Sequence, residues 1–181
     1  KPWAVACDEP GHAPSGIRPD NNAGGTHRDG RRNALWGTLM AGGWGNEWFF
    51  GVSYKHGDVW CQDFRTRDGW FDSCRHALAF FTENDLPLTE MVNNNDLSSA
   101  PRDYSFFKKG EVYVVYLKGG GTTDLNLSGV DGTFSVRWYN PRRGGALQTG
   151  SVDSVSGGKK VNLGTPPDSP KRDWAILVTK T

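Results

Sequence analysis

The sequence predicts a mixed fold in which a parallel α/β segment is followed by a small antiparallel β-sandwich. The first 84 residues alternate short aromatic strands with helical segments, whereas the residues after about position 97 form short strands separated by turn residues. The composition fits turn-rich β structure, with 24 glycines, 8 tryptophans and 12% aromatic residues. The charge changes as well: residues 1–99 carry 9 Lys/Arg against 13 Asp/Glu, and residues 100–181 carry 12 against 7. We therefore expect two regions with different tasks.

Length and composition exclude several classes of protein. With 181 residues, 36% hydrophobic and 23% charged, the chain can form a real core and is not a disordered tail. No apolar run approaches the roughly 20 residues that a membrane span needs. A net charge of +1 argues against a nucleic-acid binder. The first residues, Lys-Pro-Trp-Ala-Val-Ala-Cys, lack the features of a signal peptide and resemble a strand that has lost an upstream part.

The first region, residues 1–86, is predicted to contain two strand–helix units. The predicted strands are Trp3–Cys7 and Asn46–Phe50, and the predicted helices are Arg31–Met40 and Asp68–Asn84. Strand–helix–strand order is typical of a parallel sheet, so we expect the two strands to be adjacent and joined by a right-handed crossover. The second helix is predicted to bury one face, formed by Trp70, Phe71, Cys74, Leu78 and Phe81.

The second region, residues 101–181, follows a connector at 87–100 and is predicted to be an independent antiparallel sandwich. Its clearest strands are Glu111–Leu117, Asp124–Leu127, Thr133–Tyr139, Ser151–Val155, Lys160–Leu163 and Trp174–Thr179. Glu111–Leu117 is apolar on both faces after its first residue and should be central. We expect Trp138 and Trp174 in or beside the core, with Trp138 on the same face as Phe134 and Val136.

The three cysteines leave two interpretations open. Cys61 and Cys74 are near enough in sequence to close a short loop by a disulfide, which would suit an exported protein. The alternative is a pair of ordinary buried thiols. Neither these residues nor Cys7 form a metal-type CxxC motif, and we expect no cofactor and no metal site.

Motifs in both regions resemble known families. The second region is similar to the "putative collagen-binding domain of a collagenase" through Tyr113-Val-Val-Tyr116-Leu, Leu125-Asn-Leu127, Arg137-Trp-Tyr-Asn-Pro-Arg142 and Asp173-Trp174-Ala-Ile-Leu. The first region resembles the last part of a glycoside-hydrolase-like TIM barrel. That likeness rests on Trp3 to Gly11, His27-Arg-Asp-Gly-Arg31, Ala41-Gly-Gly-Trp-Gly45, Glu47-Trp-Phe-Phe-Gly51, His56-Gly-Asp58 and Cys61-Gln-Asp-Phe-Arg65.

The resemblance implies the last two βα units of a (β/α)8 barrel, incomplete in this chain, ahead of the sandwich. A complete barrel takes about 250 residues, so the earlier strands would come from another chain or a severed segment. The implied protein is a secreted or periplasmic glycoside hydrolase that acts on a polysaccharide or oligosaccharide. The alternative is a non-catalytic carbohydrate-binding protein, or a structural protein that self-assembles.

Glu9 is the first candidate catalytic residue. It follows a predicted strand, and TIM-barrel active sites gather at the carboxyl ends of their strands. In the similar barrels a Glu ending strand seven is the nucleophile and the acid/base ends strand four, which this chain lacks. A retaining glycosidase needs both groups, about 5–5.5 Å apart. Asp8 and Glu9 should point in opposite directions, so only one should enter the barrel mouth. The alternative is an ordinary acidic turn.

Glu47 is the second catalytic candidate, within the aromatic sequence Asn46–Phe50. Apolar surroundings raise a carboxyl pKa, as a general acid requires. The alternative is a salt bridge to an arginine such as Arg31 or Arg65.

Further residues are candidates for binding a sugar rather than for catalysis. Tryptophan rings can stack on pyranose faces, and loop histidines and carboxylates can hydrogen-bond hydroxyl groups. The predicted substrate-binding residues are His12, Trp44, Trp48, Trp60 and Asp63. Buried packing is the alternative for Trp48, and a charged brace with Arg65 is the alternative for Asp63.

Overall fold

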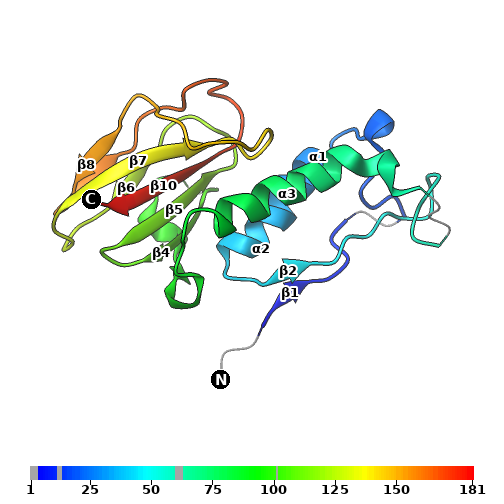
Figure 1. Cartoon of the computed structure of the whole chain (residues 1–181), viewed down its shortest axis with the longest axis horizontal. Helices are drawn as coiled ribbons and strands as arrows, with labels where there is room; N and C mark the ends of the chain where they lie inside the picture. Colours follow the sequence, from blue (N-terminus) through cyan, green and yellow to red (C-terminus); the bar gives the residue numbers. More distant parts are fainter. Residues whose placement is uncertain (1–3, 12–13, 60–62, 101) are drawn as a thin grey trace.

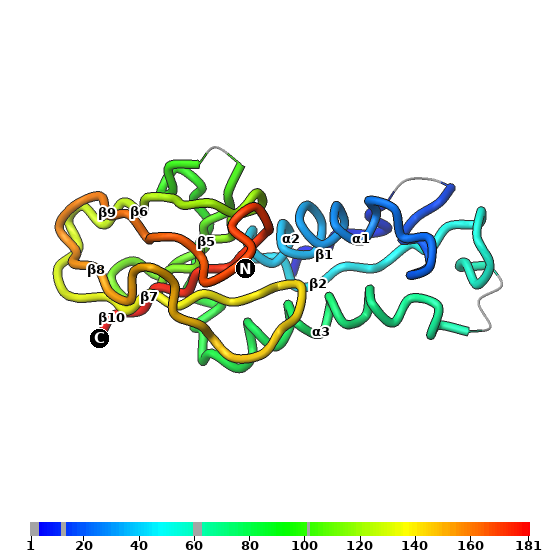
Figure 2. Tube along the Cα trace, turned by 90° about the horizontal axis from the view of Figure 1, so that it is seen from above, coloured from blue at the N-terminus to red at the C-terminus, as the bar shows by residue number. Residues whose placement is uncertain are grey.

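The computed structural model describes residues 4–11, 14–59, 63–100 and 102–181. A β-domain lies at one end of the molecule, the helices lie beside it, and loops form the opposite end (Figures 1 and 2). Among the described residues, no helix combines the length and apolar character needed to cross a bilayer.

The first region contains the predicted parallel pair of strands. β1 (Ala6–Cys7) and β2 (Gly45–Asn46) are parallel, with Ala6 opposite Gly45 and Cys7 opposite Asn46. The strands are shorter than predicted, and β2 begins one residue earlier. This confirms the predicted adjacency and direction for the described residues; Trp3 lies outside them.

Two helical segments follow these strands. The first is one continuous run of α1 (Thr26–Asp29), a π-helical stretch (Gly30–Leu35) and α2 (Trp36–Met40), so it begins five residues before the predicted start. The second is α3 (Asp68–Thr82), which a short 3-10 turn (Phe64–Arg67) precedes. Further 3-10 turns are Asp20–Asn22, Leu88–Glu90 and Asn95–Leu97.

The buried face of α3 matches the predicted face in part, because Trp70 and Phe81 are buried as predicted and Cys74 packs against the same core. Phe71 and Leu78 are 38% and 55% exposed, whereas Phe80 and Ala77 are completely buried. The helix packs between the rest of the first region and the β-domain. Because it has these two neighbours, its buried residues do not form one apolar stripe.

The β-domain is built on one antiparallel sheet of six strands in the order β3-β4-β5-β10-β7-β8. β6 pairs with β9 in a separate two-stranded sheet. The strands are β3 (Val92–Asn93), β4 (Tyr104–Lys108), β5 (Val112–Leu117), β6 (Asp124–Asn126), β7 (Thr133–Tyr139), β8 (Ser154–Ser156), β9 (Lys160–Asn162) and β10 (Trp174–Lys180). β5 is central and fully buried, as predicted.

The two faces of the large sheet have different partners. One face joins β6 and β9 in a core that contains Trp138, Phe134, Val136 and Trp174, as predicted. The other face shares a core with Trp36 of α2 and with α3. Trp36 stacks on Tyr116, with ring centroids 4.7 Å apart and planes 8° apart. The sandwich is therefore not independent, and this corrects the sequence-based expectation.

A buried ion cluster also joins the regions. Arg31 donates two hydrogen bonds to the Asp173 carboxylate, at 2.8 and 2.9 Å, and the Tyr116 hydroxyl donates a third at 2.8 Å. Arg32 adds a contact at 3.3 Å. Burial alone would raise the pKa of Asp173, but the hydrogen bonds and charge of Arg31 and the Tyr116 hydroxyl lower it to about 2.

Candidate functional site

The parallel pairing of β1 and β2 brings acidic residues together at the carboxyl ends of both strands. The Glu47 backbone N–H donates to the Cys7 carbonyl at 3.0 Å, one residue beyond the last paired position. Asp8 and Glu9 follow β1 directly, and Glu47 follows β2 directly. The carboxyl ends of parallel strands meet at one edge of a sheet, so this geometry creates a cluster of carboxyl groups at that edge.

The nearest partner of Glu47 is Asp8. Their side chains are hydrogen-bonded, and this bond raises the pKa of Glu47 above its ordinary value. The charges of Asp8, Glu9 and Asp58 raise it further. A hydrogen bond between two carboxyl groups forms when one of them carries a proton. All four carboxyl groups are exposed, which keeps them open to a ligand.

The ion-pair alternative for Glu47 is wrong. Arg31 lies against Asp173, and Arg65 lies against Asp63 at 2.8 Å. Sequence reasoning placed Asp8 opposite to Glu9 and did not assign it a partner. The parallel register identifies that partner, because Cys7 opposite Asn46 places the next residues, Asp8 and Glu47, side by side.

The backbone around this cluster is tightly constrained. Glu9 has a φ of 43°, which non-glycine residues seldom adopt. The Asp58 carboxylate accepts hydrogen bonds from the backbone N–H groups of Phe50 and Gly51, at 2.8 and 3.0 Å. A Cβ atom on Gly51 would lie 2.2 Å from the Pro14 carbonyl oxygen, so only glycine permits this close approach of the two loops.

Backbone hydrogen bonds join the loops that follow β1 and β2. Ile17 donates to the Phe49 carbonyl and Val52 donates to the Pro14 carbonyl, both at 2.8 Å. The two loops therefore form one unit, and the acidic cluster is held by the segments that supply it.

The remaining predicted tryptophans have separate positions. Trp48 is half-buried and packs edge-on against Trp70, with ring centroids 4.5 Å apart, so the packing alternative holds for it. Trp44 is 69% exposed but precedes β2, at the end opposite to the acidic residues. The structure therefore does not bring Trp44 together with Glu9 and Glu47.

Asp63 is used locally. Its carboxylate accepts from the Arg65 backbone and guanidinium, and these bonds lower the pKa of Asp63 to about 2. This is the charged-brace alternative. His12, Trp60 and Cys61 lie outside the described residues. Burial raises the pKa of the Cys74 thiol to about 12, and the disulfide between Cys74 and Cys61 stays a prediction.

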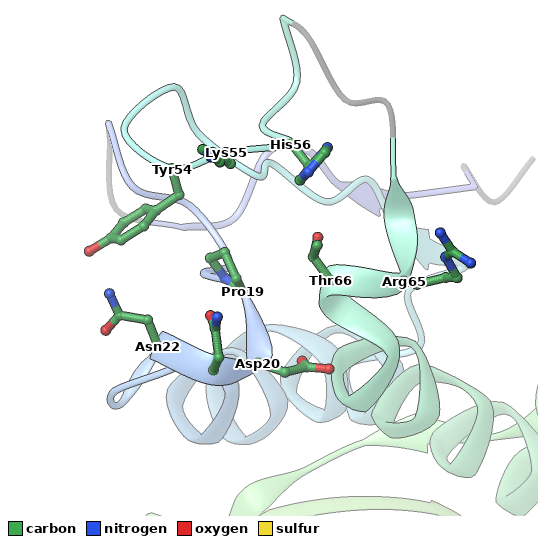
Figure 3. Close-up of a pocket in the computed structure, with 9 residues that line it drawn as sticks. Pro19, Asp20, Asn22, Tyr54, Lys55, His56, Arg65 and Thr66 are labelled. Carbon is green, nitrogen blue, oxygen red and sulfur yellow. The ribbon is translucent and has the colours of Figure 1, made fainter.

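A polar cavity of about 670 Å³ lies among the same loops (Figure 3). Tyr54, Lys55 and His56 come from the segment after β2, and Asp20 and Asn22 come from the segment after β1. In Figure 3 these side chains and Thr66 surround an open space. An aromatic ring with amide, hydroxyl and carboxylate groups is suited to a polyhydroxylated ligand. Sequence reasoning missed Tyr54 and Asn22, because only the folded loops bring them together.

Comparisons with known proteins agree with this architecture. The family model described as "Putative collagen-binding domain of a collagenase" matches residues 86–179. A search of curated proteins finds no match. Solved structures with a similar fold include two glycoside hydrolase chains.

One is a glycoside hydrolase family 5 protein from Bacteroides vulgatus ATCC 8482, with a TM-score of 0.64 and 16% identity. Another, titled "Glycoside hydrolase", has a TM-score of 0.63 and 15% identity. Each match covers 86% of this chain but only 36% and 37% of the other chains. At this identity the likeness concerns the fold.

The fold is therefore similar to part of the fold of these two chains. More narrowly, because the family match spans more than half of its length, this chain belongs to the family of the "putative collagen-binding domain of a collagenase".

Proposed function

We propose that this chain is the carboxyl-terminal portion of a secreted glycoside hydrolase, in which β1 and β2 are strands seven and eight of a (β/α)8 barrel. The observation that carries the proposal is the set of carboxyl groups at the carboxyl ends of two adjacent parallel strands. This is the edge at which TIM-barrel enzymes place their catalytic residues. The fold likeness to glycoside hydrolases supports the same assignment.

In this proposal Glu9 is the nucleophile of a retaining mechanism. Its carboxylate attacks the anomeric carbon, and the glycosidic C–O bond breaks as an acid outside this chain protonates the leaving oxygen. Water then cleaves the glycosyl ester, and the same outside group takes the proton. The left-handed backbone at Glu9 supports this role, because strained conformations cluster at active sites.

The Asp8–Glu47 pair has a supporting role in the proposal. Because the pKa of Glu47 is raised, this group keeps its proton to a higher pH than an ordinary glutamate, and until it ionises the pair places less negative charge beside Glu9 than two carboxylates would. A protonated carboxyl group can also donate a hydrogen bond to a sugar hydroxyl or ring oxygen. Glu47 is thus proposed to bind substrate beside the nucleophile.

A second candidate function is carbohydrate binding without hydrolysis. The Tyr54 cavity favours it, because this cavity combines an aromatic ring with polar groups and requires no catalytic pair. The two functions make different demands on Glu9. Hydrolysis requires its charge, whereas binding in the Tyr54 cavity does not.

The test is Glu9→Gln in a polypeptide that includes the remaining barrel strands, assayed with a panel of 4-nitrophenyl glycosides and oligosaccharides. The substitution keeps the size of the side chain and removes its charge. We expect kcat to fall about a thousandfold or more while oligosaccharide binding is retained. Glu83→Gln, at an exposed position after α3, is the matched control and should leave kcat unchanged.

The 181-residue chain alone supplies a second test. We expect no turnover from it, because the acid/base is assigned to a strand that it lacks. Hydrolysis by this chain alone, or full activity in the Glu9→Gln polypeptide, would refute the assignment of Glu9.

A further inference from the structure

A second cavity, of about 570 Å³, lies on the β-domain and is lined mainly by cationic residues. Arg142 and Arg143 come from the turn after β7, and Lys171 and Arg172 come from the turn before β10. The turns meet because β7 and β10 are antiparallel neighbours, with Tyr139 opposite Ala175. The sheet register thus brings together basic residues that are about 30 positions apart in the sequence.

Backbone contacts fix the shape of both turns. In the first, Gly144 donates to the Asn140 carbonyl at 2.9 Å, and Arg142 donates to the Asn140 side chain at 3.1 Å. In the second, Gly121 donates to the Pro170 carbonyl at 2.7 Å, and Ser169 has a left-handed φ of 43°. The cavity is therefore preformed, which lowers the entropy lost when a ligand binds.

Arg142 is the least exposed of the four cations that line the cavity. Its guanidinium lies over the Trp174 ring, 5.1 Å from the ring centroid, and donates to the Asp173 carbonyl. The side chain is only 12% exposed. Arg142 is also 3.8 Å from the Asp173 carboxylate, but Arg31 already holds both oxygens of that group. Most of the charge of Arg142 thus remains uncompensated.

The other three cations extend into solvent. Lys171 and Arg172 are exposed and form no ion pair within the described part of the chain. Arg143 has one long contact, 3.9 Å from Asp168, and its side chain is 74% exposed. Such a contact contributes little, because water screens exposed charges. The cavity therefore presents several cations with almost no compensating anion.

We propose that this cavity binds the carboxylate or sulfate groups of an acidic polysaccharide. Arginine guanidinium groups bind carboxylate and sulfate oxygens through paired hydrogen bonds, and the preformed cavity holds several of these donors in one place. A net charge of +1 for the chain and the confinement of the cations to one cavity favour a sugar acid over nucleic acid, which needs a longer basic stripe. The site is separate from the acidic cluster, and this proposal does not depend on hydrolysis there.

The test compares three ligands on the 181-residue chain by isothermal titration calorimetry: polygalacturonate, chondroitin sulfate and the neutral polymer dextran. A duplex DNA of matched charge is the fourth. We expect the two acidic polysaccharides to bind, with affinity that falls as salt rises, and dextran not to bind at this site. Trigalacturonate and inorganic sulfate, titrated separately, distinguish a sugar acid from a free anion.

Two charge-matched variants locate the site. The first is the triple variant Arg143→Gln, Lys171→Gln, Arg172→Gln, which leaves the buried Arg142 in place. We expect it to bind polygalacturonate about tenfold more weakly or worse. The control is Arg102→Gln, Lys109→Gln, Lys159→Gln, three exposed cations elsewhere on the β-domain, and we expect less than about a twofold change.

Three outcomes would overturn the proposal. In the first, neither acidic polysaccharide binds. In the second, the two triple variants weaken polygalacturonate binding equally. In the third, DNA binds as tightly as polygalacturonate and loses the same affinity in the first variant. The last result would assign the cavity to nucleic acid. Thermal melts of both variants establish that a loss of binding is not a loss of folding.

Discussion

The molecule holds carboxyl groups in two opposite kinds of surroundings. One is Asp173 in the β-domain, and the other is the Asp8–Glu47 pair at the ends of β1 and β2. Asp173 is completely buried and contacts Arg31, Arg32 and Tyr116, which together lower its pKa to about 2. Glu47 is exposed, and its nearest charged neighbours are acidic, so its pKa is raised.

The difference separates a structural role for Asp173 from the functional role proposed for the acidic cluster. A carboxylate surrounded by donors is fixed and has no free lone pair for a ligand. The Glu47 carboxyl group has a raised pKa and remains accessible to solvent, and perturbed pKa values of this kind cluster at acid–base sites. Removing each group should therefore affect different properties: stability for Asp173, and titration or chemistry for the acidic cluster.

The largest expected effect is that of Asp173→Asn on stability. The variant leaves Arg31 buried beside a neutral group, and breaking a buried ion pair in this way costs about 3–5 kcal/mol. We expect urea denaturation to show this loss at pH 7. Asp131→Asn, at an exposed turn of the same domain, is the control and should change the free energy of unfolding by less than about 0.5 kcal/mol.

The same comparison predicts how acid affects the contribution of Asp173. The pKa of Asp173 in the folded protein, about 2, is below the ordinary value of 3.8. The contribution of Asp173 to the free energy of unfolding is therefore complete above about pH 4 and is lost as pH falls toward 2. An Asp173→Asn variant as stable as the original at pH 7 would show that this cluster does not join the two regions.

A comparison with Asp103 tests whether neighbouring cations, and not burial alone, set the pKa of Asp173. Asp103 is also buried, but one of its carboxylate oxygens has no partner among the described residues, and the other accepts a hydrogen bond from the Lys118 backbone N–H. Burial raises the pKa of Asp103 to about 6. A raised carboxyl pKa has the opposite linkage: its contribution to stability is complete below about pH 4 and is lost as pH rises through 6.

Asp103→Asn removes this titration. We expect the stability of the variant relative to the original protein to increase by about 2–3 kcal/mol between pH 4 and pH 7. Urea denaturation at both pH values measures the change. If the difference in stability between the variant and the original protein is constant across this range, Asp103 stays ionised in the folded protein. Burial would then not raise its pKa.

Regular elements with strong local signals were predictable from sequence. Thr133–Tyr139 alternates cleanly and forms β7 with the predicted bounds, and α3 begins at the predicted Asp68. The parallel pairing of β1 with β2 followed from the strand–helix–strand order. β4 (Tyr104–Lys108) was not singled out as a strand, because its five residues become a strand through pairing with β5.

Long-range contacts were not predictable in the same way. Arg31 and Asp173 are 142 residues apart, and nothing near either residue indicates the other. The face of α3 was misassigned in part for the same reason, since the core contains Phe80, and Leu78 is exposed. At the candidate site, Glu9 and Glu47 were chosen from residue type and position, but the role of Asp8 depends on a strand register that the sequence leaves open.

The smallest expected effect on stability is at the acidic cluster, where the measurement is a titration. The Glu47 carboxyl should titrate above its ordinary value because Asp8 hydrogen-bonds to it and repels its charged form. Asp8→Asn removes the charge but keeps a side chain of the same size. We expect the pKa of Glu47 to fall toward its ordinary value in this variant, as followed by the side-chain carboxyl ¹³C shift in NMR titrations. The urea midpoint should not change measurably, because both side chains are exposed.

Asp58→Asn is the control. The charge of Asp58 is the smallest of the contributions that raise the pKa of Glu47, so this pKa should move much less than with Asp8→Asn. If Glu47 titrates normally in the original protein, or if both variants shift it equally, the pair does not share a proton and the contrast with Asp173 fails. If Asp8→Asn alone restores the ordinary value, the proton belongs to the pair that the β1–β2 register creates.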